Sequence, residues 1–518
     1  MVMLHWQLPE QWECSEYLAT AGGMIHRARN GNSEQPTSHN SLPKFHGSRG
    51  FITQPTHTAY SHSQIPTSMA SISHFSAATM LALLILIVGC GDSSRQSSTS
   101  NPAAASPQAF IPDLKKRTFE SKPSQEFTKW QKLIEGYRTD IEKHPDQLEN
   151  YVKAAEVYLQ ESRVSGDHHF YIPVASAILD SVLRRQPNSY EALMLRASIS
   201  MTQHQFANAK QQIQQVIAAN RKNAFAWGVL CDAYVELGHY DSALVACDSM
   251  MAIRPDIRAY SRASYLRELF GDPKGAMELM IQAVNSGGPG EESKAWAAYT
   301  LGGLYLNAGK LDTADYLFQK TLEERPSYPY AIAGQAMVKA MKSEYPGAVT
   351  LLTSALEISS EHLFLEQLAD LYLAMGKLQE AKGLQQKVVD AFTQHQASGW
   401  NVDRELALFS ANHRINLDDA VMRAKRDHQT RPMNIDACDT YAWALFQNGA
   451  APESLPLIRT AIRMNTQHAT LFYHAAAIYA ANNLRDSAAM MLKKATGINS
   501  RIDLLNHAAA DSLRLRLR

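Results

Sequence analysis

Residue types that take part in catalysis are common in this chain of 518 residues, but they do not occur at the spacings that enzymes use. There is no Gly-x-x-x-x-Gly-Lys-Ser/Thr loop to cradle phosphates, no His-Glu-x-x-His pair for zinc, and no Gly-x-Ser-x-Gly turn for a nucleophile. The glycine-rich stretch at residues 287–290 lies between helical segments, whereas a dinucleotide-binding loop follows a strand. We therefore predict no catalytic residues, no enzymatic activity and no cofactor.

Two adjacent histidines, His168 and His169, come closest to a metal-binding pattern. A zinc ion in a protein takes three or four protein ligands, and no third ligand stands at a suitable spacing from this pair. The sequence therefore predicts no metal site.

Cys90 suggests chemistry of another kind, the attachment of a lipid. It ends an apolar stretch, residues 77–90, that is too short to span a bilayer comfortably and suits the core of a signal peptide. The last four residues, Ile-Val-Gly-Cys at 87–90, resemble the lipobox of bacterial lipoproteins. The resemblance implies cleavage before Cys90, a diacylglyceryl group on its sulfur and, because Gly91 follows, delivery to the outer membrane.

The position of this stretch limits the interpretation. A signal peptide lies at the start of a chain and carries a basic segment, whereas this stretch begins near residue 77 and no Lys or Arg stands between Met69 and Cys90. Translation from Met69 would account for the position. An uncleaved anchor helix and a chance apolar run are the alternatives.

The organisation of the N-terminal region follows from its composition. Residues 1–68 are rich in His, Ser, Thr and Gln without any helical or strand period, so we expect them to be disordered or untranslated. Residues 69–89 form the expected signal peptide. Residues 90–125 contain Ser, Pro and Ala in a composition that cannot bury a core, and we expect a flexible tether there.

The rest of the chain is dominated by small residues that recur about every 34 positions. A second small residue stands twelve positions before nearly every one of these anchors, as at Ala197, Cys231 and Gly302. Two helices cross closely only where neither carries a bulky side chain, so the two small residues mark a crossing. A period of this length is typical of stacked helix pairs. The ten anchors are Ala175, Ala209, Ala243, Ala276, Ala314, Ala348, Ala381, Ala420, Ser454 and Ala488.

Other recurring residues mark where helices end. Pro187, Pro255, Pro326 and Pro432 each stand twelve positions after an anchor, and each is expected to end the second helix of its pair. Together these patterns resemble the tetratricopeptide repeat. The best copy consists of Trp227, Leu230, Cys231, Tyr234, Gly238, Tyr240, Ala243 and Pro255.

The resemblance implies an all-α fold. We expect a right-handed superhelical α-solenoid of about ten tetratricopeptide-like helix pairs over residues 126–500, followed by a capping helix at residues 501–518. Open-ended arrays need such a polar cap for solubility.

Three units are longer than the others. About eight extra residues precede Ala175, including His168 and His169, and we expect them to loop out between the two helices. Further inserts lie at residues 287–290 and 394–401. Inserted loops in repeat arrays gather on particular faces, where they either are tolerated surface or contact a partner.

Charge and cysteine usage narrow the function further. Lys+Arg and Asp+Glu both number 50, so the chain has no net positive charge to bind nucleic acid by releasing counterions, and we predict no nucleic-acid partner. Cys231 and Cys247 fall on the two helices of one unit. They are either buried free thiols or, in an oxidising compartment, a bridge.

The resemblance also implies a binding groove. In the family, first-helix residues at eighteen, fifteen and eleven positions before the anchor face a concave surface. Aromatic and Met side chains there bury large areas, and carboxylates orient polar or basic segments. Packing between neighbouring units is the alternative role for each residue. The candidates are Phe225, Asp232, Trp296, Tyr299, Tyr330, Met337, Glu366, Asp370, Asp439, Trp443 and Tyr473.

Three functional hypotheses remain at this point. The favoured one is a lipid-anchored scaffold in the bacterial cell envelope whose groove binds an unidentified peptide or protein. The alternative is an outer-membrane lipoprotein that captures glycans or nutrients beside a transporter, although such proteins carry longer loops than this chain has. An enzyme or the regulatory subunit of one is the third.

Overall fold

The computed structural model describes residues 111–117 and 123–517. The apolar stretch, Cys90 and the tether as far as residue 110 lie outside the described residues. Within the described part every regular element is a helix and there is no strand, which confirms the all-α prediction.

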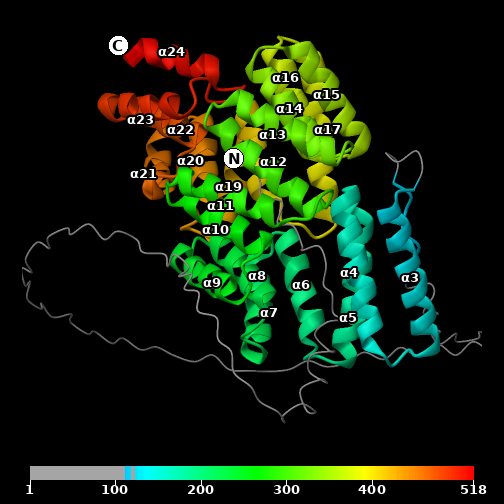
Figure 1. Ribbon diagram of the computed structural model, residues 1–518. Helices are drawn as coiled ribbons and strands as arrows, with labels where there is room; N and C mark the ends of the chain where they lie inside the picture. The colour runs from blue at the N-terminus through cyan, green and yellow to red at the C-terminus, as the bar shows by residue number, and fades with distance from the viewer. Residues whose placement is uncertain (1–110, 118–122, 518) are drawn as a thin grey trace, which may run out of the picture. The chain divides into compact units, whose positions relative to one another are not determined.

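Ten helix pairs follow one another along the chain (Figure 1), as the repeat predicted. The first helices are α4 (Leu148–Ser165), α6 (Tyr190–Thr202), α8 (Ala224–Glu236), α10 (Ile257–Leu269), α12 (Glu292–Asn307), α14 (Pro329–Met341), α16 (His362–Ala374), α18 (Asp403–His413), α20 (Ile435–Gln447) and α22 (Ala469–Ala481). The second helices are α5 (His168–Arg185), α7 (Phe206–Ala219), α9 (Tyr240–Ile253), α11 (Pro273–Ser286), α13 (Leu311–Glu324), α15 (Tyr345–Ile358), α17 (Leu378–Ala397), α19 (Leu417–Thr430), α21 (Ala451–Ala461) and α23 (Arg485–Ile498). Helix α3 (Gln125–Lys143) precedes the pairs, a 3-10 turn (Ile462–Met464) follows α21, and α24 (His507–Leu517) ends the array.

The anchors lie where the repeat predicted. All ten have 0% of their surface exposed, because each sits where the helices of its pair cross. Gly302 shows how little room a crossing leaves, since a Cβ atom there would lie 2.4 Å from the ring of Phe318. Gly334, on the next first helix, contacts the same ring, so Phe318 is held between two glycines.

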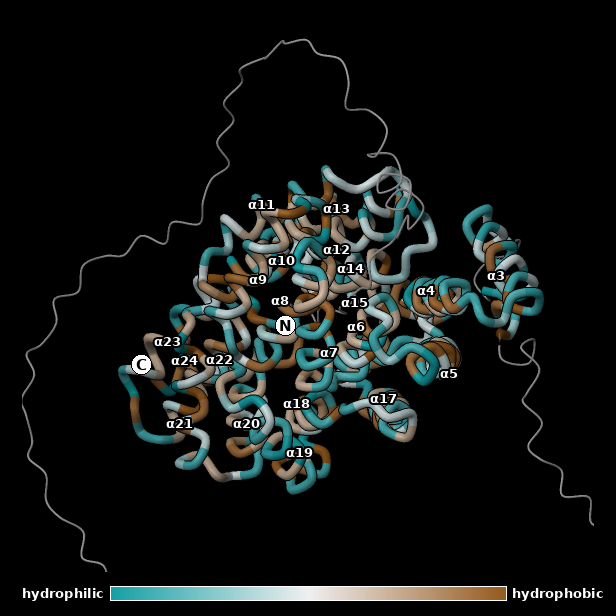
Figure 2. The backbone as a smooth tube through the Cα atoms, turned by 90° about the horizontal axis from the view of Figure 1, so that it is seen from below, coloured by the Kyte–Doolittle hydropathy of each residue, from teal (hydrophilic) through white to brown (hydrophobic). Residues whose placement is uncertain are grey.

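Local sequence signals set the helix ends. Each of the four repeat prolines stands two residues after the end of a second helix, as Pro187 does after α5. Several first helices then begin at a side-chain cap: Ser189, Asn223 and Asp256 accept hydrogen bonds from backbone N–H groups of α6, α8 and α10. In Figure 2 hydrophobic and hydrophilic segments alternate along the helices, as expected for elements with one buried face.

The extra residues of the first pair do not loop out, and that prediction is wrong. They lengthen the helices, so that α4 and α5 have 18 residues each. The polar insert at residues 394–401 likewise extends α17 to 20 residues. The stretch before Gly166 contains no helix breaker. Glu161 is buried there against Arg117 from before the array, and Ser162 forms a hydrogen bond with His168 of α5. Only residues 287–290 form the expected connection between helices.

Ordered packing begins earlier than we expected from composition. Ile111 and Leu114, which fall within the predicted tether, are buried in the cluster formed by α3, α4 and α5. Arg117 makes a buried ion pair with Glu161 at 2.8 Å. Apolar side chains and this charge pair therefore fix residues 111–117 to the array.

Pairs far apart in sequence meet along a line of contacts that we call the seam. At the seam the C-terminal end of a first helix touches the loop between two later pairs, 160 to 199 residues further along the chain. Asn and Thr side chains from those loops bind backbone carbonyls that a helix leaves unpaired at its end. The hydrogen bonds run from Asn434 to Val235 and Glu236, from Thr466 to Leu269 and from Asn499 to Leu306, at 2.7 to 3.2 Å.

The seam has a steric requirement as well. Gly238, with a positive φ of 74°, packs so closely on the backbone of Met433 that a Cβ atom would lie 2.4 Å from its carbonyl carbon. Since about 195 residues correspond to between five and six 34-residue units, the array returns on itself after that number of pairs.

Candidate binding surface

The eleven predicted groove residues fall into two groups. Six are half-buried and keep part of their surface accessible to water: Trp296, Tyr330, Met337, Glu366, Asp370 and Asp439. Five are buried inside the array: Phe225, Asp232, Tyr299, Trp443 and Tyr473.

Contacts between neighbouring pairs explain the buried group. The carboxylate of Asp232 in α8 accepts two hydrogen bonds from Arg262 in α10, at 2.6 and 2.8 Å. Trp443 stacks on His474 of the next pair, with ring centroids 3.9 Å apart, and its indole N–H donates to Asn412. These side chains join first helices to one another, which is the packing role that the sequence left open.

The half-buried group, together with Glu268 and Asp436, forms what we call the inner surface. Asp370 forms an ion pair with His413 at 3.2 Å, and Asp439 forms one with His474 at 3.1 Å. Among the described residues, the Glu366 carboxylate has one ion-pair contact, with His362 at 3.8 Å, and Arg404 acts on it from a distance. Burial raises the pKa of Glu366 to about 8, and the neighbouring carboxylates of Asp370 and Glu405 add to the rise.

Two further carboxyl groups share this electrostatic environment, and sequence reasoning missed both. Burial raises the pKa of Glu268 to about 7, and Asp436 adds to that rise. Burial also raises the pKa of Asp436 to about 6, although Arg404 opposes it. Neither carboxylate makes a hydrogen bond or ion pair with another described residue. Asp436 stands eighteen positions before its anchor Ser454, so the groove rule would have found it, whereas Glu268 fits no groove position.

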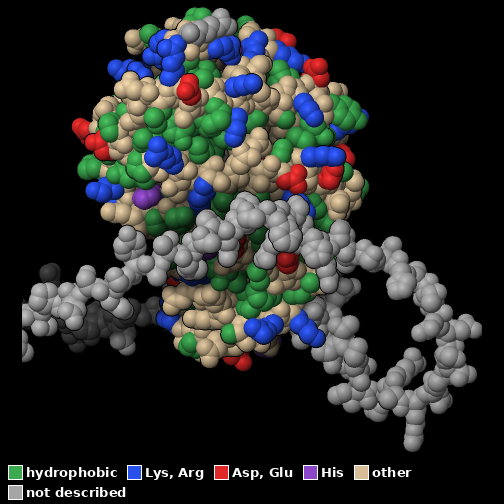
Figure 3. Space-filling model, turned by 90° about the vertical axis from the view of Figure 1, so that its left-hand side faces the viewer, with side chains coloured by type: hydrophobic (Ala, Val, Ile, Leu, Met, Phe, Trp, Pro, Cys, Tyr) green, Lys and Arg blue, Asp and Glu red, His purple; other side chains and the backbone are tan. Residues whose placement is uncertain are grey.

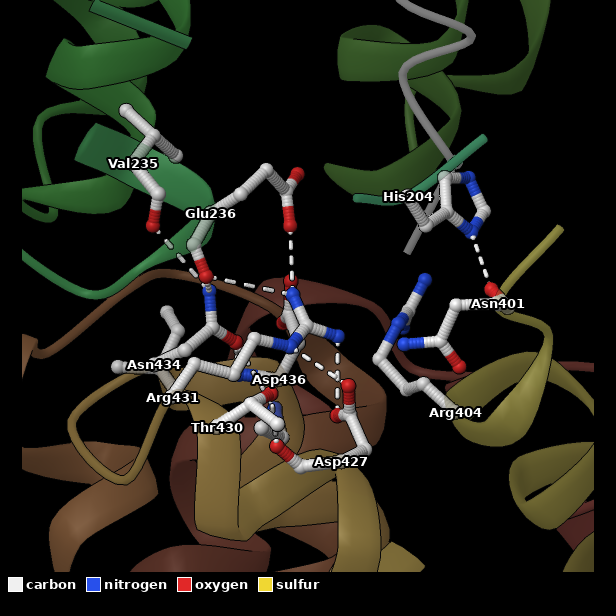
Figure 4. A network of polar contacts seen from close by, with 12 residues as sticks. His204, Val235, Glu236, Asn401, Arg404, Asp427, Thr430, Arg431, Asn434 and Asp436 are labelled. Atoms are coloured by element: carbon white, nitrogen blue, oxygen red, sulfur yellow. Dashed lines mark hydrogen bonds and ion pairs between the residues drawn. The ribbon is translucent and has the colours of Figure 1, made fainter. Parts of the chain in front are cut away.

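The arginines near these acids are committed to other partners. Figure 4 shows Arg431, which directly follows α19, between two carboxylates, those of Asp427 in α19 and of Glu236 across the seam, at 2.8 and 2.6 Å. Arg404, to the right of them in the figure, pairs with Glu405 at 3.0 Å. Charge neutralisation at the seam therefore leaves Glu268, Glu366 and Asp436 as acids without a strong cationic partner among the described residues.

The chemistry of this arrangement is that of an acceptor for positive charge. Carboxyl groups whose pKa is raised to between about 6 and 8 keep part of their protons near neutral pH. A cation brought beside such a group favours its ionised form and so releases the proton. No group of three or more His, Cys, Asp or Glu in the described part of the chain is arranged to hold a metal ion. Cys231, Cys247 and Cys438 are free and buried, so the alternative of a bridge is not realised in this structure.

Other surfaces are less distinctive. In the face shown in Figure 3, Lys and Arg side chains are scattered among hydrophobic and acidic ones and form no single patch. Among the described helices, none combines the length and the apolar character that crossing a membrane requires.

Comparison with known proteins agrees with this architecture. Residues 200–264 match the family model of the tetratricopeptide repeat. No curated protein matches the chain significantly. Among solved structures, the Cut9–Hcn1 hetero-tetramer of the APC/C is similar at 15% identity over 78% of each chain, with a TM-score of 0.42. A tetratricopeptide repeat protein from Parabacteroides merdae is similar at 18% identity over 50% of this chain and 98% of that one, with a TM-score of 0.30. Such distant likenesses concern the fold alone.

The fold and the matched segment define the class of protein. The chain is an all-α repeat solenoid built from helix pairs. Within this solenoid, residues 200–264, which include α7, α8 and α9, match the tetratricopeptide repeat.

Proposed function

We propose that this chain is a protein-interaction scaffold whose inner surface binds a basic segment of a partner protein. The observation that carries the proposal is the set of three acids, Glu268, Glu366 and Asp436, whose pKa values burial raises and which have no strong cationic partner among the described residues. Such groups are destabilised as anions in the absence of ligand. A Lys or Arg side chain would relieve that destabilisation on binding, and perturbed carboxyls of this kind tend to mark functional sites.

The buried aromatic residues favour a protein ligand over a glycan. Phe225, Tyr299, Trp443 and Tyr473 are packed inside the array, so four of the six aromatic candidates do not offer a face for stacking on a sugar ring. The carboxylates of the inner surface match a cationic peptide better than a neutral saccharide. We therefore retain protein binding as the proposed function and place glycan capture second.

A lipid anchor at Cys90 remains part of the proposal. The support is the lipobox-like sequence at residues 87–90 together with the apolar stretch before it, and the proposed location is the outer membrane of a bacterial cell envelope. Mass spectrometry of the mature N-terminus is the test. A diacylglyceryl-modified Cys90 supports the anchor, while an unmodified N-terminus at Met1 or Met69 would rule it out.

A peptide-binding measurement tests the inner surface. We expect a fluorescent Lys- and Arg-rich peptide to bind the full chain, with affinity that falls as salt rises and increases from pH 6 to pH 8 as Glu268 and Glu366 lose their protons. An acidic peptide of equal length should not bind. Replacing the three acids together, as Glu268→Gln, Glu366→Gln and Asp436→Asn, should lower the affinity by at least about tenfold, since each ion pair lost costs on the order of 1 kcal/mol.

The matched control removes the same charge from the outer face. Glu278, Glu380 and Glu453 are exposed on second helices, and changing all three to Gln alters net charge equally while leaving the inner surface intact. Equal loss of binding in both triple variants would show a nonspecific charge effect and would contradict the proposal.

A further inference from the structure

Five histidines gather around a single tryptophan at the seam. His168 and His169 begin α5, His204 lies in the turn between α6 and α7, and the later pairs contribute His362 in α16 and His395 in α17. Trp400 stands in the middle, with ring centroids 4.9 Å from His395, 5.7 Å from His168 and 6.0 Å from His204. His395 also stacks on His169 at 4.5 Å and meets His362 at 5.6 Å.

The cluster joins two parts of the array that are far apart in sequence. The backbone N–H of Asn401 donates to the carbonyl oxygen of Gln203 at 3.0 Å, and the side chain of Gln205 donates to the carbonyl of Gly399 at 3.0 Å. The imidazole of His204 is 3.0 Å from the carbonyl oxygen of Asn401. The aromatic rings therefore lie directly on backbone contacts that hold the seam together.

Few opposite charges face these rings. Glu361 contacts His168 at 3.3 Å, Glu405 lies 3.5 Å from His204, and Glu366 lies 3.8 Å from His362. Asp167 and Glu361 act on His169 from a distance. Among the described residues no carboxylate forms an ion pair with His395. The rings of His169 and His362 contact it instead, and Glu361 and His168 act on it from a distance. A positive charge on His395 would thus face other histidines in a partly dehydrated space.

We infer that this histidine cluster is a pH-sensitive latch, in which the neutral rings of His395 and His169 hold the seam closed and protonation of these two rings opens it. Stacked neutral rings pack against Trp400, whereas charged rings would repel one another and require water. The proposed peptide binding does not use the His168 and His169 pair. The inference therefore does not depend on the identity of a ligand.

The sign of the effect follows from the surroundings of the rings. Burial lowers the pKa of His395 to about 3, and His362, His169 and His168 add to the lowering. Burial and His168 also lower the pKa of His169. When the seam separates, His395 regains an ordinary pKa near 6.5. The closed state is therefore fully favoured above pH 6.5 and becomes less favoured as the pH falls. The equilibrium constant for opening of the seam should rise by about tenfold from pH 7.5 to pH 5.5.

Hydrogen exchange of the full chain, followed by mass spectrometry, measures this opening directly. The amide of Asn401 is bonded across the seam, so peptides covering residues 399–404 report on it. After correction for intrinsic exchange rates, we expect their protection to fall by about tenfold from pH 7.5 to pH 5.5. Peptides from the middle of α8 should keep their protection, which separates opening of the seam from global unfolding.

Two variants sharpen the test. His395→Phe keeps an aromatic ring beside Trp400 but cannot be protonated. The tenfold fall in hydrogen-exchange protection at residues 399–404 should therefore be lost in this variant. His507→Phe, on the solvent-facing side of α24, is the matched control and should behave as the wild type. Protection at residues 399–404 that does not change with pH in the wild-type chain, or that changes equally in His395→Phe, would overturn the latch. The wild-type measurement decides the question even if the variant folds poorly.

Discussion

Individual residues of the inner surface are placed at the expense of stability. The carboxyl group of Glu366 is held where burial opposes its ionisation, and Asp370 and Glu405 add like charge. By contrast, Asp232 is more deeply buried but is matched by Arg262 at 2.6 Å. A chain optimised only for folding would not keep an unmatched acid in this position, which is why we assign Glu366 a binding role.

This placement predicts that Glu366→Gln stabilises the protein. Because the pKa of Glu366 in the folded chain, about 8, lies above its usual value of 4.5, the group contributes fully below pH 4.5 and its contribution is lost as the pH rises through 8. We expect the variant to match the wild type at pH 4.5 and to exceed its free energy of unfolding by about 2 kcal/mol at pH 8, given that 24% of the side chain is still accessible. Thermal unfolding at both pH values is the measurement.

The control for this prediction is Glu357→Gln. Glu357 lies on the exposed side of α15, and the same change there should leave the difference between the two pH values unaltered. A Glu366→Gln protein that is no more stable than the wild type at pH 8 would remove the electrostatic argument for the inner surface.

At the scale of the helix, small side chains decide how closely elements approach. Phe318 in α13 fills the space between Gly302 of α12 and Gly334 of α14, so one ring connects three helices. Glycine inside a helix is normally unfavourable by about 1 kcal/mol relative to alanine, and it is kept here because the ring occupies the place of a Cβ atom.

Gly302→Ala should therefore destabilise the array even though alanine is the better helix former. A Cβ atom at this position lies 2.4 Å from the Phe318 ring, and overpacking of this kind costs about 1 to 3 kcal/mol. Gly383→Ala in α17 is the matched control, because nothing lies within 4 Å of that position, and it should stabilise by about 0.5 to 1 kcal/mol. Urea denaturation of both variants gives the comparison. Changes of opposite sign in the free energy of unfolding support close helix crossing at Gly302, and a stabilised Gly302→Ala protein would refute it.

Particular elements show what the sequence could predict. The anchors, the four prolines and the ten pairs were predictable because each depends on residues within one unit, whose spacing is fixed by the helix. The helical extension of α4 was not foreseen, since Glu161 is buried by Arg117 from before the array. Asp436 occupies a recognisable groove position, whereas Glu268 is drawn into the inner surface only by tertiary packing.

At the scale of the molecule, the seam is the feature that no local pattern encodes. Its contacts join residues 160 to 199 positions apart, and their register depends on small rotations that accumulate over about five to six helix pairs. The seam brings the histidines around Trp400 together and places Glu236 beside Arg431. Both the inner surface and the proposed latch depend on this return of the array on itself.

Site-directed crosslinking across the seam is the most direct test of whether the array returns on itself. The Asn307 side chain donates to the carbonyl oxygen of Gln467 at 2.9 Å, although the two residues are 160 positions apart. With Asn307→Cys and Gln467→Cys in one chain, a short bismaleimide should join the two peptides in nearly every molecule in dilute solution, as read by mass spectrometry after digestion. Each chain that carries only one of the two substitutions is the control. Absence of the intramolecular crosslink in the folded protein would contradict the account.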